Sequence, residues 1–159
     1  MKKIMFALAA VAAFASAPAF ASDFSGVHAE ITAGLDDVTK AKDVTDVTYG
    51  AAVGVDFALT DKTIVGVEAN VDNVFDRRAI GADARVGYEV VKNVLVYGKV
   101  GYTNIHLANI GEVDGLRYGG GVEVRVADPL YVKFEYRNSD YTHVNIGRNN
   151  FILGAGIRF

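Results

Sequence analysis

The segment that decides the fold is Phe151-Ile152-Leu153-Gly154-Ala155-Gly156-Ile157-Arg158-Phe159, at the end of the sequence. Every second residue from Phe151 to Phe159 is apolar, and the residues between them are mostly small or charged. Successive side chains of a β-strand point to opposite faces, so this period of two predicts a strand with one apolar face. The aromatic residue at the final position lies on that face, whereas most soluble domains finish in a polar tail.

The opposite end of the sequence has the pattern of a secretory signal peptide. Two lysines precede an apolar run, Ile4–Phe14, and Ala19 and Ala21 form a small-x-small cleavage site. We therefore expect residues 1–21 to be removed and residues 22–159 to form one mature domain. The alternative is a transmembrane helix, but a serine and a proline interrupt the run before it reaches the roughly 20 apolar residues that a span needs.

The composition limits the classes of partner and chemistry. Without the two lysines of the signal peptide, 14 basic side chains remain against 19 acidic ones, a net charge of −5. This balance argues against nucleic acid as a partner, because phosphate binding needs concentrated Lys and Arg. The chain has no cysteine, so it has no disulfides and no thiolate metal site. We expect no cofactor.

Eight segments of the mature sequence alternate like the last one. In each, a set of mainly apolar residues shares one parity, and no position of that parity is charged. Their ranges are 27–35, 49–59, 65–71, 80–90, 94–102, 116–126, 130–136 and 151–159. Segments of this length can cross the apolar core of a bilayer when they are tilted. The pattern predicts an all-β protein with eight strands.

The connections between these segments alternate in length. Short turns are expected near 60–63, 91–93 and 127–129, and longer loops at 36–46, 73–78, 104–114 and 138–147. This alternation is typical of an antiparallel up-and-down transmembrane β-barrel with short periplasmic turns and longer extracellular loops. An even number of strands then places both ends of the mature chain on the periplasmic side of a bacterial outer membrane.

Periodicity alone does not say which face is inside, because a soluble lipocalin-like barrel would alternate with its apolar face inward. Three features favour the membrane barrel. The polar face is rich in glycine, which makes room inside a narrow barrel (Gly34, Gly50, Gly54, Gly66, Gly81, Gly87, Gly101, Gly119, Gly121, Gly154 and Gly156). Aromatic residues of the apolar face gather near strand ends, as in an interfacial girdle (Tyr49, Phe57, Tyr88, Tyr102, Tyr118, Tyr136, Phe151 and Phe159). The signal peptide and the terminal aromatic also occur together.

Fifteen charged residues then face the lumen. They are Glu30, Asp56, Glu68, Asp72, Asp83, Arg85, Glu89, Lys99, Arg117, Glu123, Arg125, Lys133, Glu135, Arg137 and Arg158. The first four strands hold six of the acids and the last four hold six of the bases, so an acidic half faces a basic half across the barrel. The pairs expected from their levels are Glu30 with Lys99, Glu68 with Lys133 or Arg137, and Glu89 with Arg158.

Because unpaired buried charge is costly, we expect these residues to form a salt-bridge network that fills the lumen. An eight-stranded barrel has room for little besides side chains, so a wide pore is not expected. The alternative is a narrow, porin-like ion path through rearranged pairs, which conductance measurements would reveal.

The remaining chemistry-bearing residues do not form a recognisable active site. The histidines His28, His106 and His143 lie in three separate segments, whereas metal ligands must converge. Ser139 and His143 are close in sequence, but they lie in a predicted loop without a clear orienting acid. We expect no catalytic or metal-binding role. The loops 36–46, 104–114 and 138–147 are the candidate contacts for a surface ligand, which would make the protein an adhesin.

The sequence resembles a known family at this point. The stretch Gly115–Glu123, the turn at Ala127–Leu130 and Glu135–Tyr141 are similar to the small OmpA-like, opacity-type outer-membrane β-barrel proteins, often called the porin family. Gly154, Ile157 and Phe159 resemble the signal that the barrel-assembly machinery reads. The usual Glu-Tyr-Arg-Tyr pattern is broken at Asn138. The resemblance implies an integral outer-membrane protein in contact with lipid and no enzymatic activity, and it fixes no ligand.

Overall fold

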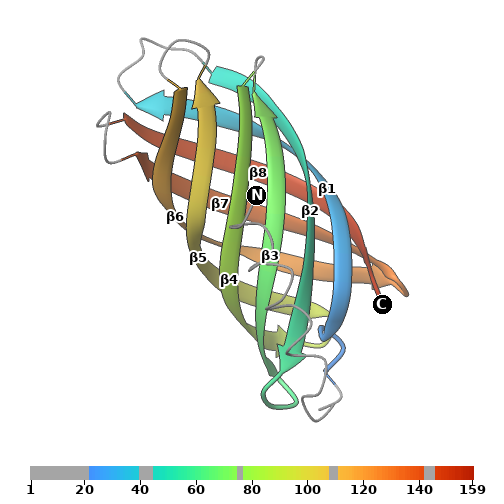
Figure 1. Ribbon diagram of the computed structural model, residues 1–159. Coiled ribbons are helices and arrows are strands. Elements are labelled where there is room, and N and C mark those ends of the chain that lie inside the picture. The colour runs from blue at the N-terminus through green and yellow to red at the C-terminus, as the bar shows by residue number, and fades with distance from the viewer. Residues whose placement is uncertain (1–21, 40–44, 75–76, 108–110, 142–145) are drawn as a thin grey trace.

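The computed structural model describes residues 22–39, 45–74, 77–107, 111–141 and 146–159, which form a closed antiparallel barrel (Figure 1). The strands are β1 (Gly26–Thr39), β2 (Thr45–Ala58), β3 (Thr63–Val74), β4 (Arg77–Val91), β5 (Val94–Leu107), β6 (Gly111–Ala127), β7 (Leu130–Tyr141) and β8 (Ile146–Arg158). Each strand pairs with the next in sequence, and β8 pairs with β1. The predicted eight-stranded up-and-down barrel is confirmed. Within the described ranges, no helix is long and apolar enough to cross a membrane.

Apolar side chains cover the outer wall, and charged side chains lie inside. Ile31 is 71% exposed, whereas its neighbour Glu30 is 5% exposed. This is the reverse of a soluble barrel, because an apolar wall of this extent is stable only in contact with lipid. The period of two therefore predicts the two faces of the wall correctly, with the residues of the polar parity facing the lumen.

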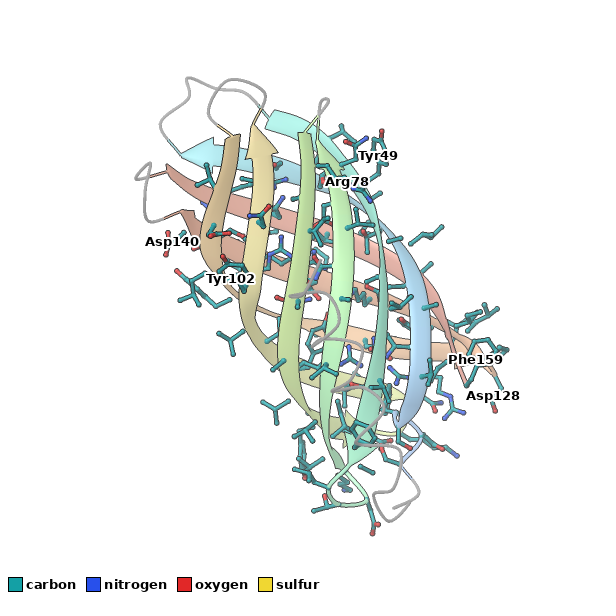
Figure 2. The ribbon with its side chains drawn as sticks, viewed as in Figure 1. Tyr49, Arg78, Tyr102, Asp128, Asp140 and Phe159 are labelled. Carbon is teal, nitrogen blue, oxygen red and sulfur yellow. The ribbon has the colours of Figure 1, made fainter. Side chains whose placement is uncertain are left out.

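Aromatic residues lie on the outer wall near both ends of the barrel (Figure 2). Tyr49, Tyr102 and Phe159 are all more than half exposed. On β7 and β8 the ring of Phe151 lies 5.1 Å from that of Tyr136 and 6.4 Å from that of Phe134. Such aromatic residues sit favourably at the two membrane–water interfaces.

The strands extend further than the sequence predicts at the end opposite the short turns. The loops expected at 36–46, 73–78, 104–114 and 138–147 are replaced over most of their length by continuing strand pairs, such as Asp36 with Asp46 and Leu107 with Gly111. The prediction is wrong because it ended each strand where apolar residues ended, whereas pairing requires only backbone donors and acceptors. With 12 to 17 residues each, the strands exceed what a bilayer requires.

The first and last strands close the barrel along twelve residue pairs, from His28–Arg158 to Thr39–Gly147. Beyond this register the backbone N–H of Val27 donates to the carbonyl of Phe159 at 3.1 Å, and the N–H of Phe159 donates back at 2.8 Å. The final residue is therefore fixed to the start of β1. This end, called the turn end below, also carries the connections at 59–62, 92–93 and 128–129.

Glycine on the inner wall makes room for larger side chains at two positions. A Cβ added at Gly54 would lie 2.6 Å from the imidazole of His28, and one added at Gly121 would lie 2.8 Å from the hydroxyl of Tyr97. Both distances are shorter than real contacts allow. The glycine-rich inner face thus lets bulky residues cross a narrow lumen.

Candidate functional site: the lumen

The lumen is lined by charged side chains from all eight strands, and nearly all of them are buried. The acids are Glu30, Asp36, Asp56, Glu68, Asp72, Asp83, Glu123 and Glu135, and the bases are Arg85, Lys99, Arg117, Lys133, Arg137 and Arg148. The Arg158 side chain is 7% exposed. Ionised groups this deep need opposite charges and hydrogen bonds within reach. The structure supplies them in three layers.

The layer nearest the turn end, here called the Asp56 ring, is built from the even-numbered strands. Arg85 on β4 donates to both oxygens of Asp56 on β2, at 2.7 and 2.5 Å, and lies 3.2 Å from Glu123 on β6. Arg158 on β8 completes the ring with 2.7 Å contacts to Asp56 and to Glu123. Two arginines and two carboxylates therefore alternate around the lumen, as expected when inward side chains of alternate strands share a level.

The middle layer, here called the lysine cluster, joins mainly odd-numbered strands. Lys99 on β5 lies 2.8 Å from Glu68 and 3.2 Å from both Asp83 and Glu135. Lys133 on β7 is ion-paired with Glu30 and lies 3.2 Å from Glu135 and 3.6 Å from Glu68. Each ammonium group thus contacts three carboxylates from different parts of the wall, so the cluster crosses the interior.

Two buried tyrosines complete the lysine cluster. The hydroxyl of Tyr97 donates to Glu135 at 2.6 Å, and that of Tyr131 donates to Glu30 at 2.8 Å. The guanidinium of Arg85 lies 5.1 Å from the centre of the Tyr97 ring, within the range of a cation–π contact. The tyrosines connect the lysine cluster with the Asp56 ring.

The outermost layer is centred on two arginines. Arg117 donates to Asn70 at 2.6 Å and to Thr103 at 3.0 Å, and it lies 3.5 Å from Asp72. Arg137 lies 3.3 Å from the same Asp72 and is also paired with Glu135 of the middle layer. At the far end of the lumen Arg148 on β8 pairs with Asp36 on β1.

His28 is a buried member of the network. From the sequence it was considered only as a metal ligand. Its side chain is fully buried, with Nδ1 3.2 Å from Asp56 and Nε2 3.6 Å from Glu68. It therefore joins the Asp56 ring to the lysine cluster. The buried acids named above outnumber the bases, Arg158 included, by eight to seven, so an imidazolium at His28 would bring their formal charge to zero. Its inward parity, shared with Glu30, could have identified it.

An apolar group at the turn end was also missed. Phe24, Ile64, Leu95 and Tyr97 form a buried cluster inside the barrel. Phe24 precedes β1, and its carbonyl accepts a hydrogen bond from Arg158 at 2.8 Å. The segment leading into β1 thus places a phenyl ring against the end of the lumen. The alternating segments alone gave no signal for it, because Phe24 lies before the first of them.

Two of the three expected ion pairings differ from those in the structure. Glu30 pairs with Lys133 rather than Lys99, and Arg158 pairs with Asp56 and Glu123 rather than Glu89. Both expectations were wrong because tilted strands in a sheared barrel do not keep equal sequence counts at one level.

The expected partners of Glu68 are found, whereas two other candidate residues, Glu89 and Arg125, lie outside the closed lumen. Glu68 lies within ion-pair distance of both Lys133, at 3.6 Å, and Arg137, at 3.9 Å. Glu89 is half-buried, and Arg125 lies at the turn-end rim rather than in the closed lumen.

The residues considered for catalysis or metal binding are not brought together. Ser139 lies on β7 with its side chain buried, not in a loop as expected, because the strand continues to Tyr141. His143 and the side chain of His106 lie outside the described residues. Among the residues that the structure describes, no three His, Cys, Asp or Glu side chains are arranged to hold a metal ion.

Comparisons with known proteins agree with this architecture. Ail, the attachment invasion locus protein of Yersinia pestis, is 15% identical with a TM-score of 0.60, and the match covers 86% of this chain and 100% of Ail. The N-terminal β-barrel domain of Pseudomonas aeruginosa OprF is 16% identical, with a TM-score of 0.59 and coverage of 83% and 97%. The outer membrane enzyme PagL is 12% identical, with a TM-score of 0.59 and coverage of 82% and 99%. At these identities the likeness shows the fold alone.

A search of curated protein sequences gave no match. The family model of the outer membrane protein β-barrel domain matches residues 6–159, nearly the whole chain. Together with the closed eight-stranded barrel, its apolar outer wall and its charged interior, this match shows that the chain belongs to the outer membrane protein β-barrel family.

Proposed function

We propose that this protein is a non-catalytic barrel whose lumen is closed by its own ion pairs, and that it serves envelope structure and surface presentation. The lysine cluster is the observation that carries the proposal. Lys99 and Lys133 contact carboxylates from β1, β3, β4 and β7, so their side chains occupy the middle of the interior. An ion crossing there would have to separate several buried pairs at once, and each separation is costly.

The orientation of the barrel is part of this proposal. The turn end, with its connections at 59–62, 92–93 and 128–129, faces the periplasm, because outer-membrane barrels place their short turns there. Phe159 and Asp128 lie at this end, away from Tyr49 and Arg78 (Figure 2). The connections at the other end are the proposed contacts for a surface ligand. Removal of residues 1–21 would leave Ser22 at the turn end.

Phe159 and its neighbours are the proposed signal for the barrel-assembly machinery. Phe159 is 74% exposed on the outer wall, where a membrane-embedded partner can reach it, whereas Gly154 faces inward. Phe159→Ala should slow insertion in cells without changing the stability of protein refolded in vitro. If the refolded variant were instead destabilised enough to account for its slower insertion, the aromatic ring would matter only for the folded barrel.

The absence of catalysis is proposed from the site and not from the fold, since PagL is an enzyme with a similar barrel. Ser139 is buried between strands that carry Arg117 and Arg148 opposite it. A nucleophile needs a base within hydrogen-bond reach and a path for substrate, and burial denies the path. Incubation with outer-membrane phospholipid and lipopolysaccharide should therefore release no fatty acid.

Single-channel conductance in planar bilayers tests the closed lumen. Protein that has refolded, as judged by its heat-modifiable migration on gels, should give no discrete channels. The double variant Lys99→Ala, Lys133→Ala removes the cluster's two cations and should conduct cations, which verifies that inserted barrels are detected. Discrete wild-type channels that Glu68→Ala or Lys133→Ala abolishes would overturn the proposal in favour of a narrow ion path.

A further inference from the structure

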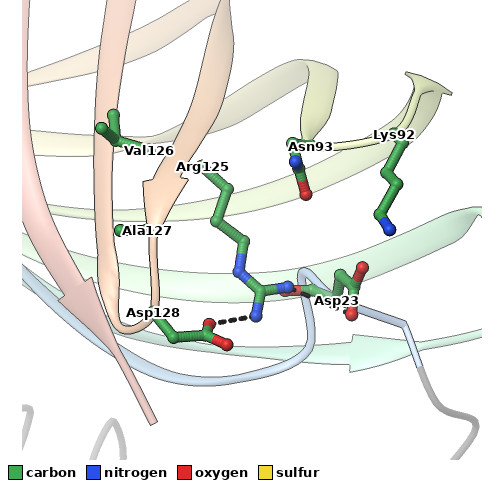
Figure 3. A pocket seen from close by; sticks show the side chains of 7 residues that line it. All are labelled: Asp23, Lys92, Asn93, Arg125, Val126, Ala127 and Asp128. Atoms are coloured by element: carbon green, nitrogen blue, oxygen red, sulfur yellow. Dashed lines mark hydrogen bonds and ion pairs between the residues drawn. The ribbon is translucent and has the colours of Figure 1, made fainter.

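A polar pocket lies at the turn end, outside the three layers of the lumen network (Figure 3). It has a volume of about 340 Å³ and is lined by Asp23, Lys92, Asn93, Arg125, Val126, Ala127 and Asp128. These residues come from the segment before β1, the β4–β5 turn, and the end of β6 with the turn that follows. The pocket therefore lies at the rim of the barrel.

The backbone around this pocket is irregular on two sides. The register shifts of the described strand pairs both occur here, between Glu89 and Val91 on β4 and between Arg125 and Ala127 on β6. The backbone N–H of Arg125 donates to the carbonyl of Asn93 at 2.9 Å, which ties the two turns together. β-Bulges are common at barrel rims, where they redirect side chains.

The pocket opens where the apolar outer wall ends. Val126, which lines the pocket, is 65% exposed, and Val91, the residue before Lys92, is 61% exposed. A molecule seated in the pocket can therefore extend an apolar part along the outer face of the barrel. This is the position that a lipid headgroup takes beside a membrane protein.

The charges in the pocket are of both signs. Arg125 is already neutralised, because its guanidinium lies 3.1 Å from the Asp23 carboxylate and also pairs with Asp128 (Figure 3). The Lys92 side chain is exposed and makes no hydrogen bond or ion pair with the residues that the structure describes, so its ammonium group is available. The side chains of Asp23 and Asp128 are 51% and 79% exposed, which leaves carboxylate oxygens open to solvent.

We propose that this pocket binds the phosphoethanolamine headgroup of a phospholipid in the periplasmic leaflet. The Lys92 ammonium pairs with the phosphate, the Asp128 carboxylate accepts hydrogen bonds from the lipid ammonium, and the acyl chains lie along Val91 and Val126. Two acids and two bases make the lining neutral overall, which favours a zwitterion over a purely anionic group. The inference rests on the proposed orientation, which places the turn end in that leaflet.

Native mass spectrometry of the detergent-purified protein tests this site. The protein is incubated with equal amounts of phosphatidylethanolamine and phosphatidylglycerol, and bound lipid is counted after mild activation. One phosphatidylethanolamine should be retained with about fivefold preference, the scale of one partly exposed charge-assisted contact. Lys92→Ser and Asp128→Asn should each abolish the preference. Lys62→Ser, which removes an exposed lysine from the β2–β3 turn at the same end, should not.

Several results would overturn the proposal. Equal retention of both lipids, or equal losses in Lys92→Ser and Lys62→Ser, would mean nonspecific attraction by surface charge. Displacement by soluble phosphoethanolamine at similar concentration would identify a soluble ligand instead of a lipid. With lipopolysaccharide added as a third competitor, its retention in place of phospholipid would show that the turn end faces the outer leaflet. Failure of the closed lumen would appear only as conductance.

Discussion

Replacing Arg85 with methionine removes one positive charge from the Asp56 ring while keeping an unbranched side chain at this position. Arg85 is almost completely buried, and it holds both oxygens of Asp56 and one of Glu123. The variant leaves Arg158 as the arginine between the two carboxylates, with its 2.7 Å contacts to each. One negative charge in the ring then has no matching cation.

The expected loss in the free energy of unfolding depends on the ion pairs that remain in the Asp56 ring. Removing one partner of a buried pair costs about 3–5 kcal/mol, because the other charge stays buried and uncompensated. Since Arg158 still contacts both acids, we expect the lower end of this range, about 3 kcal/mol. Adding Glu123→Gln to Arg85→Met removes the surplus negative charge, so the double variant should be more stable than the single one.

The measurement is the free energy of unfolding from urea titration in phospholipid vesicles, followed by far-ultraviolet circular dichroism because the chain has no tryptophan. Arg125→Met is the matched control, since its acid partners are 51% and 79% exposed and such pairs contribute about 1 kcal/mol or less. If Arg85→Met cost no more than Arg125→Met, or if Glu123→Gln made it worse, charge pairing in the lumen would not be what stabilises the barrel.

Other substitutions test the wall, the inner glycines and the turn end. Leu153 is 64% exposed on the outer wall near the middle of β8, and Leu153→Arg should lower the free energy of unfolding in vesicles by about 2–4 kcal/mol. Leu130→Arg, at the rim, should lower it by about 1 kcal/mol or less. Equal costs of the two substitutions would place Leu153 outside the hydrocarbon. Gly54→Ala should reduce the folded fraction on heat-modifiable gels because its Cβ would lie 2.6 Å from His28, whereas Gly98→Ala, with its nearest neighbour at 3.9 Å, should fold normally. Phe24→Ala should cost about 3 kcal/mol in the same urea titration as a fully buried aromatic residue, and a cost near zero would show that the ring does not pack in solution.

The sequence predicts the faces of the wall well because the period of two is a local property. Ile31 and Glu30 are adjacent, and their opposite environments follow from the geometry of a single strand. The ends of the strands are predicted less well. Asp36 and Asp46 pair through their backbones at a point where no apolar side chain indicates a strand.

The partners of the lumen charges could not be predicted from counting. Whether Lys99 or Lys133 reaches Glu30 depends on strand tilt and on the shear of the closed barrel, which are properties of all eight strands together. The place of His28 in the lumen could have been predicted from the sequence, since it shares the inward parity of Glu30. Phe24 was not, because its burial results from a turn held by Arg125 and Arg158, far away in sequence.

The seam between β1 and β8 determines how the chain can enter a bilayer. Every other strand pairing is a hairpin between sequence neighbours, but the seam joins His28 to Arg158, from opposite ends of the domain. It is the contact of highest contact order and so the slowest to find. Until it forms, two strands expose unpaired N–H and C=O groups that hydrocarbon cannot solvate, at several kcal/mol for each group. A barrel one strand short is therefore not a stable intermediate in lipid, and closure and insertion become a single committed step.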